Sequence, residues 1–456
     1  MSDKYAIILA AGKGTRMKSS YPKVVHKVLG KEMITRVLAA INGAHIKNKY
    51  VVIGHGSEFV EPLLDETSKI VFQEKQLGTG HAVLTALQTL SRDLNASDEN
   101  AMIIVSCGDT PLIKTESFTA MMKQHEEKAC AVSVMTTIVE QPTGYGRIIK
   151  DGDSISAIIE EKDASDIEKQ ITEINVGTYC FDLKFLLTEI HSLTTNNAQG
   201  EFYLTDLLKI AYQQGKKTSA YCLEDSDESL GVNNRMQLAH AEKILQKRIN
   251  TDWMRKGVTL QDPENIFITD DVQIGQDTII ESNVHLLGHT RIGSEVIIES
   301  GSRLIDAEID DYTRIRQSVI QDATVGKYCS VGPFAQLRPG TILKDHVKVG
   351  NFVEVKNSNV SDESKISHHT YIGDADIGAR VNIGCGTITC NYDGKNKYRT
   401  VIGDDAFIGS NTNLIAPIKI GEHCIIGAGS TLSKNVESTA LAFTRPPLVV
   451  KENWKK

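Results

Sequence analysis

Aliphatic residues recur at every sixth position through most of the C-terminal half of the chain. Such a period is typical of hexapeptide repeats, in which three short sides close one triangular coil of about 18 residues. The pattern predicts a parallel β-helix of about nine or ten coils that starts near Ile266 and stacks the aliphatic side chains in its interior. We expect loops where the period is lost, at 308–318 and 356–367, and a longer insertion at 391–399. Three runs keep the period: Ile268, Ile274, Ile280, Leu286, Ile292, Ile298 and Leu304; Val319, Val325, Val331, Leu337, Leu343, Val349 and Val355; and Ile402, Ile408, Leu414, Ile420, Ile426 and Leu432.

The N-terminal half instead alternates strand-like and helix-like segments. Short β-rich runs at 5–10, 50–53, 70–72 and 101–106 alternate with helical spacing at 34–41 and 81–90. This alternation predicts an α/β domain whose parallel sheet is connected by helices and binds ligands at the carboxyl ends of its strands. A strong helix-forming segment follows at 234–255. We therefore expect an α/β domain at 1–230, a linker helix at 231–251 and the β-helix domain at 252–456.

Composition narrows the class of protein. The chain has 456 residues, of which 41% are hydrophobic and 24% are charged, as in an ordinary globular protein of two or three domains. A net charge of -8 argues against a nucleic-acid or anionic-membrane binder. The eight cysteines lack zinc-site spacing, which favours reduced thiols in the cytoplasm. No apolar run approaches the ~18 residues of a membrane span.

A glycine-rich turn follows the first predicted strand. Its glycines, Gly12 and Gly14, let backbone N–H groups approach a phosphate or a base, but the spacing fits neither a dinucleotide fingerprint nor a P-loop. Arg16 and Lys23 supply cations nearby. Asp109 ends a very apolar strand and could bind Mg²⁺, with Asn233 as a second oxygen ligand. Taken singly, Lys23 also reads as a solvated lysine and Asp109 as a helix cap.

The succession of motifs resembles a known family. The glycine-rich turn is followed by Pro22-Lys23, Gln73, Leu77–Gly80, Gly108-Asp109, Gly144–Gly146, Glu160–Lys162 and Asn175, a series that resembles the sugar-1-phosphate nucleotidyltransferases. With the hexapeptide half attached, the whole chain resembles the bacterial bifunctional enzymes that are both N-acetylglucosamine-1-phosphate uridyltransferases and glucosamine-1-phosphate N-acetyltransferases. The resemblance implies a Rossmann-like nucleotidyltransferase domain, a linker helix and a left-handed parallel β-helix.

The resemblance also implies roles for residues of the N-terminal half. The reaction would be attack of the sugar phosphate on the α-phosphorus of UTP with release of pyrophosphate, which requires positioning and charge stabilisation. Uracil and ribose would be held by Leu9, Ala10, Ala11, Gly12, Gln73, Gly78 and Thr79, and the N-acetyl sugar by Gly146, Glu160 and Asn175. The phosphates would bind Arg16 and Lys23. The Mg²⁺ would bind Asp109 and Asn233, and Asn233 would also touch the nucleotide sugar.

Polar residues interrupt the hexapeptide repeat and resemble the acetyltransferase half of the same family. Acyl transfer to an amine needs a base and oxyanion donors. His368 would be the base, with Glu354 as an orienting partner. The neighbouring His369 stands where the family has a leucine-like residue, and Cys385 replaces a small alanine. The sugar phosphate would be bound by Arg338, Lys356, Tyr371 and Asn382, and acetyl-CoA by Cys385, Ser410, Ala428 and Arg445. Either of these two substrates would be bound by Asn391 and Tyr392.

The predicted function is therefore synthesis of UDP-N-acetylglucosamine from glucosamine-1-phosphate, acetyl-CoA and UTP, which feeds cell-wall precursor synthesis. A triangular prism has flat faces that suit packing around a three-fold axis, and the resemblance implies a homotrimer formed through the β-helix. Two alternatives remain open. One is a single nucleotidyltransferase with a regulatory β-helix, and the other is a non-catalytic assembly subunit of the same architecture.

Overall fold

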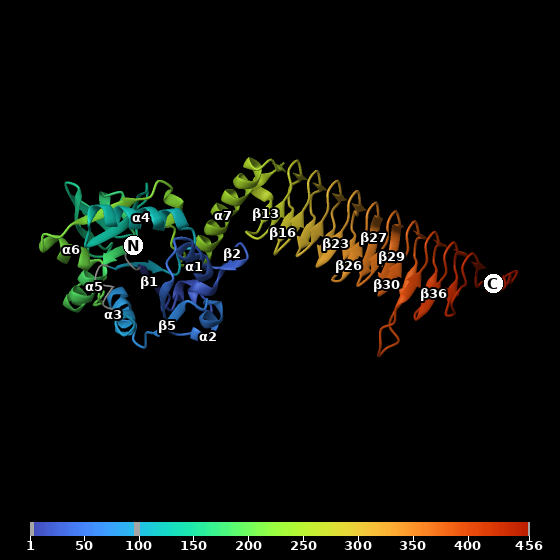
Figure 1. The fold of residues 1–456 in the computed structure, drawn as a ribbon, viewed down its shortest axis with the longest axis horizontal. Coiled ribbons are helices and arrows are strands. Elements are labelled where there is room, and N and C mark those ends of the chain that lie inside the picture. Colours follow the sequence, from blue (N-terminus) through green and yellow to red (C-terminus); the bar gives the residue numbers. More distant parts are fainter. Residues whose placement is uncertain (1–3, 95–100, 455–456) are drawn as a thin grey trace. The chain divides into compact units, whose positions relative to one another are not determined.

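A computed structural model describes residues 4–94 and 101–454 of the chain. They form two compact units that divide between Leu245 and Gln246, within the long helix α7 (Arg235–Arg255) (Figure 1). No helix in the described ranges is long and apolar enough to cross a membrane.

The first unit is built on a nine-stranded sheet with the order β11-β7-β10-β6-β1-β4-β5, to which β8 and β9 add a hairpin. β1 pairs in parallel with β4 and β6, and β4 with β5. The sheet is mixed where a parallel one was expected, because β10 runs antiparallel between β6 and β7. The strands are β1 (Lys4–Leu9), β4 (Asn48–Ile53), β5 (Ser68–Phe72), β6 (Met102–Cys107), β7 (Val132–Ile138), β8 (Arg147–Asp151), β9 (Ser154–Ile159), β10 (Glu173–Asp182) and β11 (Thr218–Cys222).

Helices cover both faces of this sheet, which explains why its central strands are apolar along most of their length. Successive side chains of a strand point to opposite faces, so Ile7 belongs to one core cluster and Ile8 to another. The first cluster includes Val83 of α3, and the second includes Phe118 of α4. The helices are α1 (Met33–Gly43), α2 (Ser57–Val60), α3 (Thr79–Leu90), α4 (Thr115–Lys128), α5 (Leu183–Glu189) and α6 (Asp206–Gln213).

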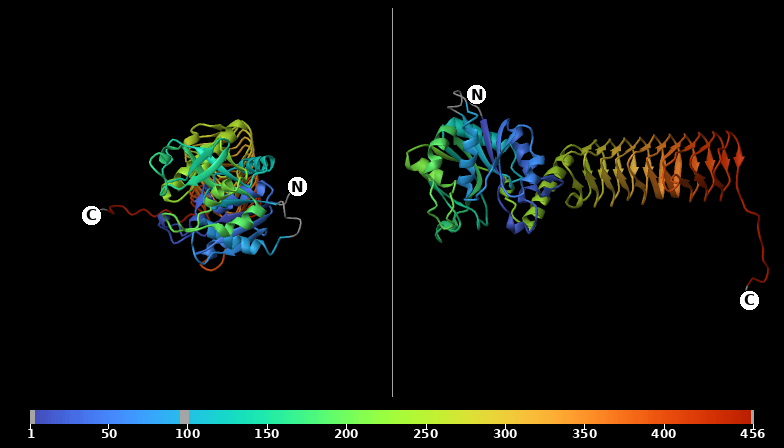
Figure 2. Two further views of the ribbon diagram at one scale, coloured as in Figure 1. Left: turned by 90° about the vertical axis from the view of Figure 1, so that its left-hand side faces the viewer. Right: turned by 90° about the horizontal axis from the view of Figure 1, so that it is seen from below.

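The second unit is a left-handed parallel β-helix, whose coils follow one another along its axis (Figure 2). Two of its sides join into a 19-stranded sheet and the third forms a nine-stranded sheet. β13 (Phe267–Ile268) pairs with β16 (His285–Leu287), placing Phe267 beside His285 one 18-residue coil later. The aliphatic series is buried as predicted, apart from the half-buried Ile274 and from Val319.

Val319 was assigned to the wrong side of the coil. It is 38% exposed, and the next residue, Ile320, is fully buried in its place. The cause is a shortened side, since the buried Ile320 is followed by the next interior residue, Val325, after five positions instead of six. One lost residue moves a side chain to the opposite face of a strand.

The two segments predicted as loops are also wrong, because both contain paired strands. The first includes β20 (Glu308–Ile309) and β21 (Arg314–Ile315), and the second lies in coils of 17 residues. In that second region β27 (Lys348–Lys356), β28 (Asn359–Val360) and β29 (Lys365–Gly373) keep the ladder intact. The period is lost because sides become shorter. By contrast, the insertion at 391–399 is a true excursion, a small hairpin bridged between Tyr392 and Lys397.

Candidate functional site

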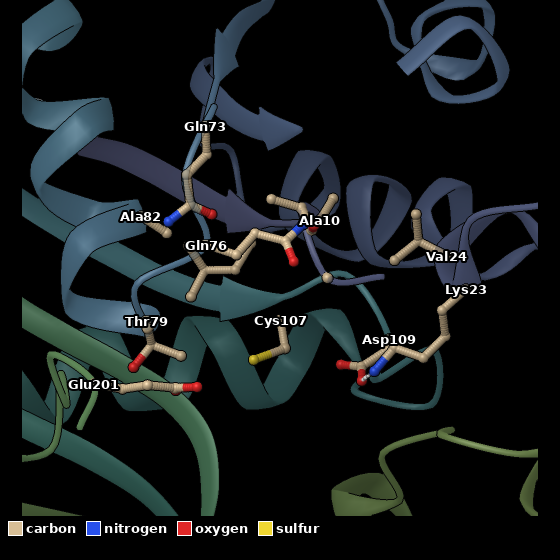
Figure 3. A pocket seen from close by; sticks show the side chains of 14 residues that line it. Ala10, Lys23, Val24, Gln73, Gln76, Thr79, Ala82, Cys107, Asp109 and Glu201 are labelled. Atoms are coloured by element: carbon tan, nitrogen blue, oxygen red, sulfur yellow. Dashed lines mark hydrogen bonds and ion pairs between the residues drawn. The ribbon is translucent and has the colours of Figure 1, made fainter. Parts of the chain in front are cut away.

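The first candidate site is a cavity of about 260 Å³ at the carboxyl ends of β1, β5 and β6, the edge at which parallel strands bind ligands. The loop after β1, the start of α3 and the segment after β6 form its walls (Figure 3). Nine predicted residues line it: Leu9, Ala10, Ala11, Gly12, Lys23, Gln73, Gly78, Thr79 and Asp109. The cavity is also lined by five residues for which the sequence predicted no role: Val24, Gln76, Ala82, Cys107 and Glu201.

The predicted cations and oxygen ligands converge beside this cavity. Lys23 Nζ donates hydrogen bonds to the carboxylate of Asp109 and, at 2.9 Å, to Asn233 Oδ1. Arg16 Nη2 donates to the same Asn233 oxygen, also at 2.9 Å. The side chains of Lys23 and Asp109 are only 15% and 16% exposed, so their charges interact with little screening by water.

The oxygen donors of this group fit a hard divalent cation. Asp109 and Asn233 now bind one ammonium between them, so a small cation in that position would reach both oxygens. Across the ranges that the structure describes, no group of three or more His, Cys, Asp or Glu side chains could hold a metal. A cation here would therefore complete its coordination with phosphate oxygens and water, as Mg²⁺ prefers.

Two glycines allow the walls of the cavity to approach closely. Gly14 has a φ of 59°, and a Cβ there would lie 2.7 Å from Lys23 Cβ. Gly78 has a φ of 110°, and its Cβ would lie 2.7 Å from the carbonyl oxygen of Phe202. Any larger residue would therefore displace Lys23 or the start of α3.

The predicted sugar-binding residues form a second cluster. A Cβ on Gly146 would lie 3.5 Å from both Asn175 Cβ and Glu160 Oε1, so the three residues meet at one point. Burial, together with the carboxylates of Asp163 and Asp206, raises the pKa of Glu160. The cluster adjoins the first cavity through Gly177, whose N–H donates to Asn175 Oδ1 at 2.9 Å and whose carbonyl oxygen lies 3.7 Å from Cys107 Sγ.

Cys107 and the buried Arg147 were missed at the sequence level. Burial raises the pKa of the Cys107 thiol to about 12, so it remains protonated and lines the cavity as a small apolar group. Arg147, next to Gly146, is 1% exposed and pairs with Glu161 at 2.7 Å, while Glu161 also accepts from the Gly144 N–H. This pair holds the Gly144–Gly146 turn against Glu160.

The second candidate site follows one corner of the β-helix. β27 and β29 continue around this corner and pair Asn351 with His368 in register. The backbone ladder continues through hydrogen bonds from Gly386 to His369, Asn411 to Cys385 and Gly429 to Ser410, at 3.0, 2.7 and 2.8 Å. His368, Cys385, Ser410 and Ala428 therefore lie along one corner on successive coils.

The two adjacent histidines contact different neighbours. His368 Nδ1 lies 3.0 Å from Asn351 Oδ1, whereas His369, at a φ of 46°, places its ring 6.3 Å from that of Phe352. The predicted orienting partner of His368 was wrong, because Glu354 instead forms an ion pair with Arg338 at 2.6 Å. Asn351 holds the imidazole in its place.

A cationic cluster lies beside this corner. Arg338 and Lys356 occupy equivalent positions on adjacent coils, one residue beyond the paired Leu337 and Val355. The ammonium of Lys397, in the hairpin insertion, lowers the pKa of Lys356, and burial adds to the effect. Two adjacent ammonium groups with a guanidinium form a strong site for an anion such as a phosphate. Lys397 was missed because it reaches the cluster from the insertion.

The remaining predicted residues surround this cluster and the corner. Tyr371 and Asn391 meet at Gly373, where a Cβ would lie 2.7 Å from the Tyr371 ring and 2.8 Å from Asn391 Nδ2. Arg445 reaches the last coils, where a Cβ on Gly427 would lie 3.4 Å from its Nη2. Asn382 pairs with Lys365, at the start of the side that carries His368. Tyr392 lies at the base of the hairpin and is 60% exposed.

Comparison with known proteins finds family matches in both units. Residues 5–254 match the nucleotidyl transferase family, and residues 271–306 and 399–434 match the bacterial transferase hexapeptide family of six repeats. The whole chain is similar to curated proteins named bifunctional protein GlmU. The one from Halalkalibacterium halodurans is 46% identical and covers 100% of this chain and 99% of its own length. The one from Listeria monocytogenes serotype 4b is 47% identical and covers 98% of this chain and 96% of its own length. The one from Heliobacterium modesticaldum is also 47% identical and covers 100% of this chain and 98% of its own length.

Proposed function

The chain belongs to the GlmU family of bifunctional proteins, and on that premise we propose that it makes UDP-N-acetylglucosamine in two consecutive reactions. The first transfers the acetyl group of acetyl-CoA to the amine of glucosamine-1-phosphate. The second transfers a uridyl group from UTP to the resulting N-acetylglucosamine-1-phosphate and releases pyrophosphate. We assign uridyl transfer to residues 1–230 and acetyl transfer to residues 252–456, with the linker helix between them.

In uridyl transfer, a phosphate oxygen of the sugar phosphate attacks the α-phosphorus of UTP as the bond to pyrophosphate breaks. The cavity would hold the nucleoside against Gln73, Gly78 and Thr79, and the adjoining cluster would hold the N-acetyl sugar. Arg16 and Lys23 would neutralise the charge that grows on the phosphates, the main requirement of this chemistry. Asp109 and Asn233 would hold Mg²⁺, which when bound supplies further charge neutralisation.

In acetyl transfer, His368 would accept a proton from the sugar amine as the nitrogen attacks the thioester carbonyl. The C–S bond then breaks, and the coenzyme leaves as a thiol once it takes up a proton. The hydrogen bond to Asn351 supports this role because it fixes the ring. The phosphate of the same substrate would bind Arg338, Lys356 and Lys397.

We further propose that the active assembly is a homotrimer. The β-helix has flat sides, and large apolar residues such as Phe334 and Phe352 stand exposed on it with their rings stacked 5.4 Å apart. A second and third copy would cover them. All eight cysteines are free thiols, which supports a reducing compartment such as the cytoplasm.

One observation carries the proposal: a single chain holds both a cavity flanked by the cations Arg16 and Lys23 in its α/β unit and a histidine beside a cationic cluster in its β-helix. Two assays on the purified chain test it. Thiol release from acetyl-CoA should depend on glucosamine-1-phosphate, and pyrophosphate release from UTP should depend on N-acetylglucosamine-1-phosphate and Mg²⁺. Pyrophosphate release without thiol release would leave the alternative of a nucleotidyltransferase with a regulatory β-helix.

A further inference from the structure

Gln73 presents its side-chain amide to the first cavity in a defined orientation. The residue follows β5, is only 4% exposed and lines the cavity. Its Nε2 lies 2.9 Å from Nδ1 of His81 in the first turn of α3. Figure 3 shows the amide nitrogen on the side of Ala82 and the amide oxygen on the side of Gln76. The oxygen is therefore the atom available to a ligand.

The imidazole that sets this orientation is itself held in place. His81 stacks on the ring of Phe202, with centroids 6.5 Å apart and planes inclined by 30°. The backbone of Phe202 accepts a hydrogen bond from Gly80 at 2.8 Å and donates one to Leu77 at 2.9 Å. Phe202 and the start of α3 are thus held together, and this packing restrains the His81 ring beside Gln73.

The chemistry of the pair determines which base the cavity accepts. The –NH₂ of Gln73 can only donate, so where it faces Nδ1 of His81 that nitrogen is the acceptor and the carbonyl oxygen is left for the ligand. A carbonyl oxygen can accept from the N3–H of uracil. The N3 of cytosine carries a lone pair instead, so cytosine would place two acceptors against each other at a buried position.

We propose that His81 is a specificity-determining positioning residue, which locks the amide of Gln73 so that the site takes a uracil nucleotide and rejects a cytosine nucleotide. The inference rests on the proposed function, which places the nucleotide base at Gln73. Without His81, rotation of the amide by about 180° exchanges its donor and its acceptor, and a cytosine then fits.

The first test compares UTP and CTP as substrates of the His81→Phe variant. Phenylalanine retains the stacking on Phe202 but has no acceptor for the amide. The ratio of kcat/KM for UTP to that for CTP should fall by about tenfold or more, as expected for loss of a buried polar discrimination. The ratio does not depend on the fraction of enzyme that is folded. Gln88→Ala, at an exposed position on the same helix, is the matched control and should leave the ratio unchanged.

The second test makes the orientation of the side chain at position 73 irrelevant. In Gln73→Glu both side-chain oxygens accept, so orientation no longer matters. Adding His81→Phe to Gln73→Glu should therefore leave the UTP to CTP ratio as it is in Gln73→Glu alone. Equal losses with UTP and CTP in His81→Phe, or the same change in ratio in both backgrounds, would overturn the inference. A wild-type chain that turns over neither nucleotide would instead refute the proposed function.

Discussion

Removal of Lys23 tests the charge-stabilising role at the uridyl site. Its ammonium contacts both Asp109 and Asn233, and its side chain is 15% exposed. Loss of one preorganised electrostatic donor typically raises the barrier by about 3 kcal/mol. For Lys23→Ala we therefore expect kcat/KM for uridyl transfer to fall about 150-fold.

The assay is pyrophosphate release from UTP in the presence of N-acetylglucosamine-1-phosphate. Acetyl transfer by the same protein serves as an internal control and should stay at the wild-type rate, because it depends on the other unit. Lys123→Ala is a matched control, since this lysine is 74% exposed on α4 and pairs only weakly with Glu127 at 3.8 Å. Uridyl transfer like that of the wild type in Lys23→Ala would refute the assignment.

Four further predictions address the rest of the molecule. An alkylating reagent should inhibit acetyl transfer through the exposed Cys385, and Cys385→Ala should remove that sensitivity; inhibition that persists in the variant would exclude this thiol. Asp374→Ala should raise KM for glucosamine-1-phosphate about tenfold, because the carboxylate of Asp374, in a residue only 8% exposed, anchors Asn391 at the base of the hairpin. An unchanged KM would show that Asp374 has no positioning role. Burial lowers the pKa of His125 to about 4, so on acidification the unfolded chain binds a proton at this residue before the folded chain does. The free energy of unfolding should therefore fall by up to about 3 kcal/mol as the pH drops from about 6.5 towards 4. The same pH dependence in His125→Gln would contradict this. Dilution to monomers should abolish acetyl transfer before uridyl transfer, because the proposed trimer forms through the β-helix that carries the acetyl site. Equal loss of both activities would count against that dependence.

The first cavity could be predicted from the sequence because its residues follow strands. Gln73 and Asp109 each stand just after a strongly apolar run, and parallel strands bring such positions to one edge. Cys107, His81 and Arg147 could not be found in the same way. Their contribution depends on burial and on neighbours that are distant in the chain.

The β-helix shows the limit of periodicity. A period of six predicts the coil and most of its interior, but it does not say where a side loses a residue. Val319 was misplaced for that reason, since pairing between coils, and not spacing along the chain, decides which face a residue takes. The roles of Lys397 and Asn351 were missed for the same reason. Lys397 reaches its partner from a hairpin insertion, and Asn351 pairs with His368 from the preceding coil.

The central claim is that one chain carries two separate active sites that work in sequence. The most direct measurement supplies His368→Ala with glucosamine-1-phosphate, acetyl-CoA, UTP and Mg²⁺ and follows the formation of UDP-N-acetylglucosamine. We expect formation to fall by about 10² to 10⁴-fold, as for loss of a general base, and to return to the wild-type rate when N-acetylglucosamine-1-phosphate is supplied. Undiminished formation from glucosamine-1-phosphate, or no recovery with the acetylated sugar, would contradict the account.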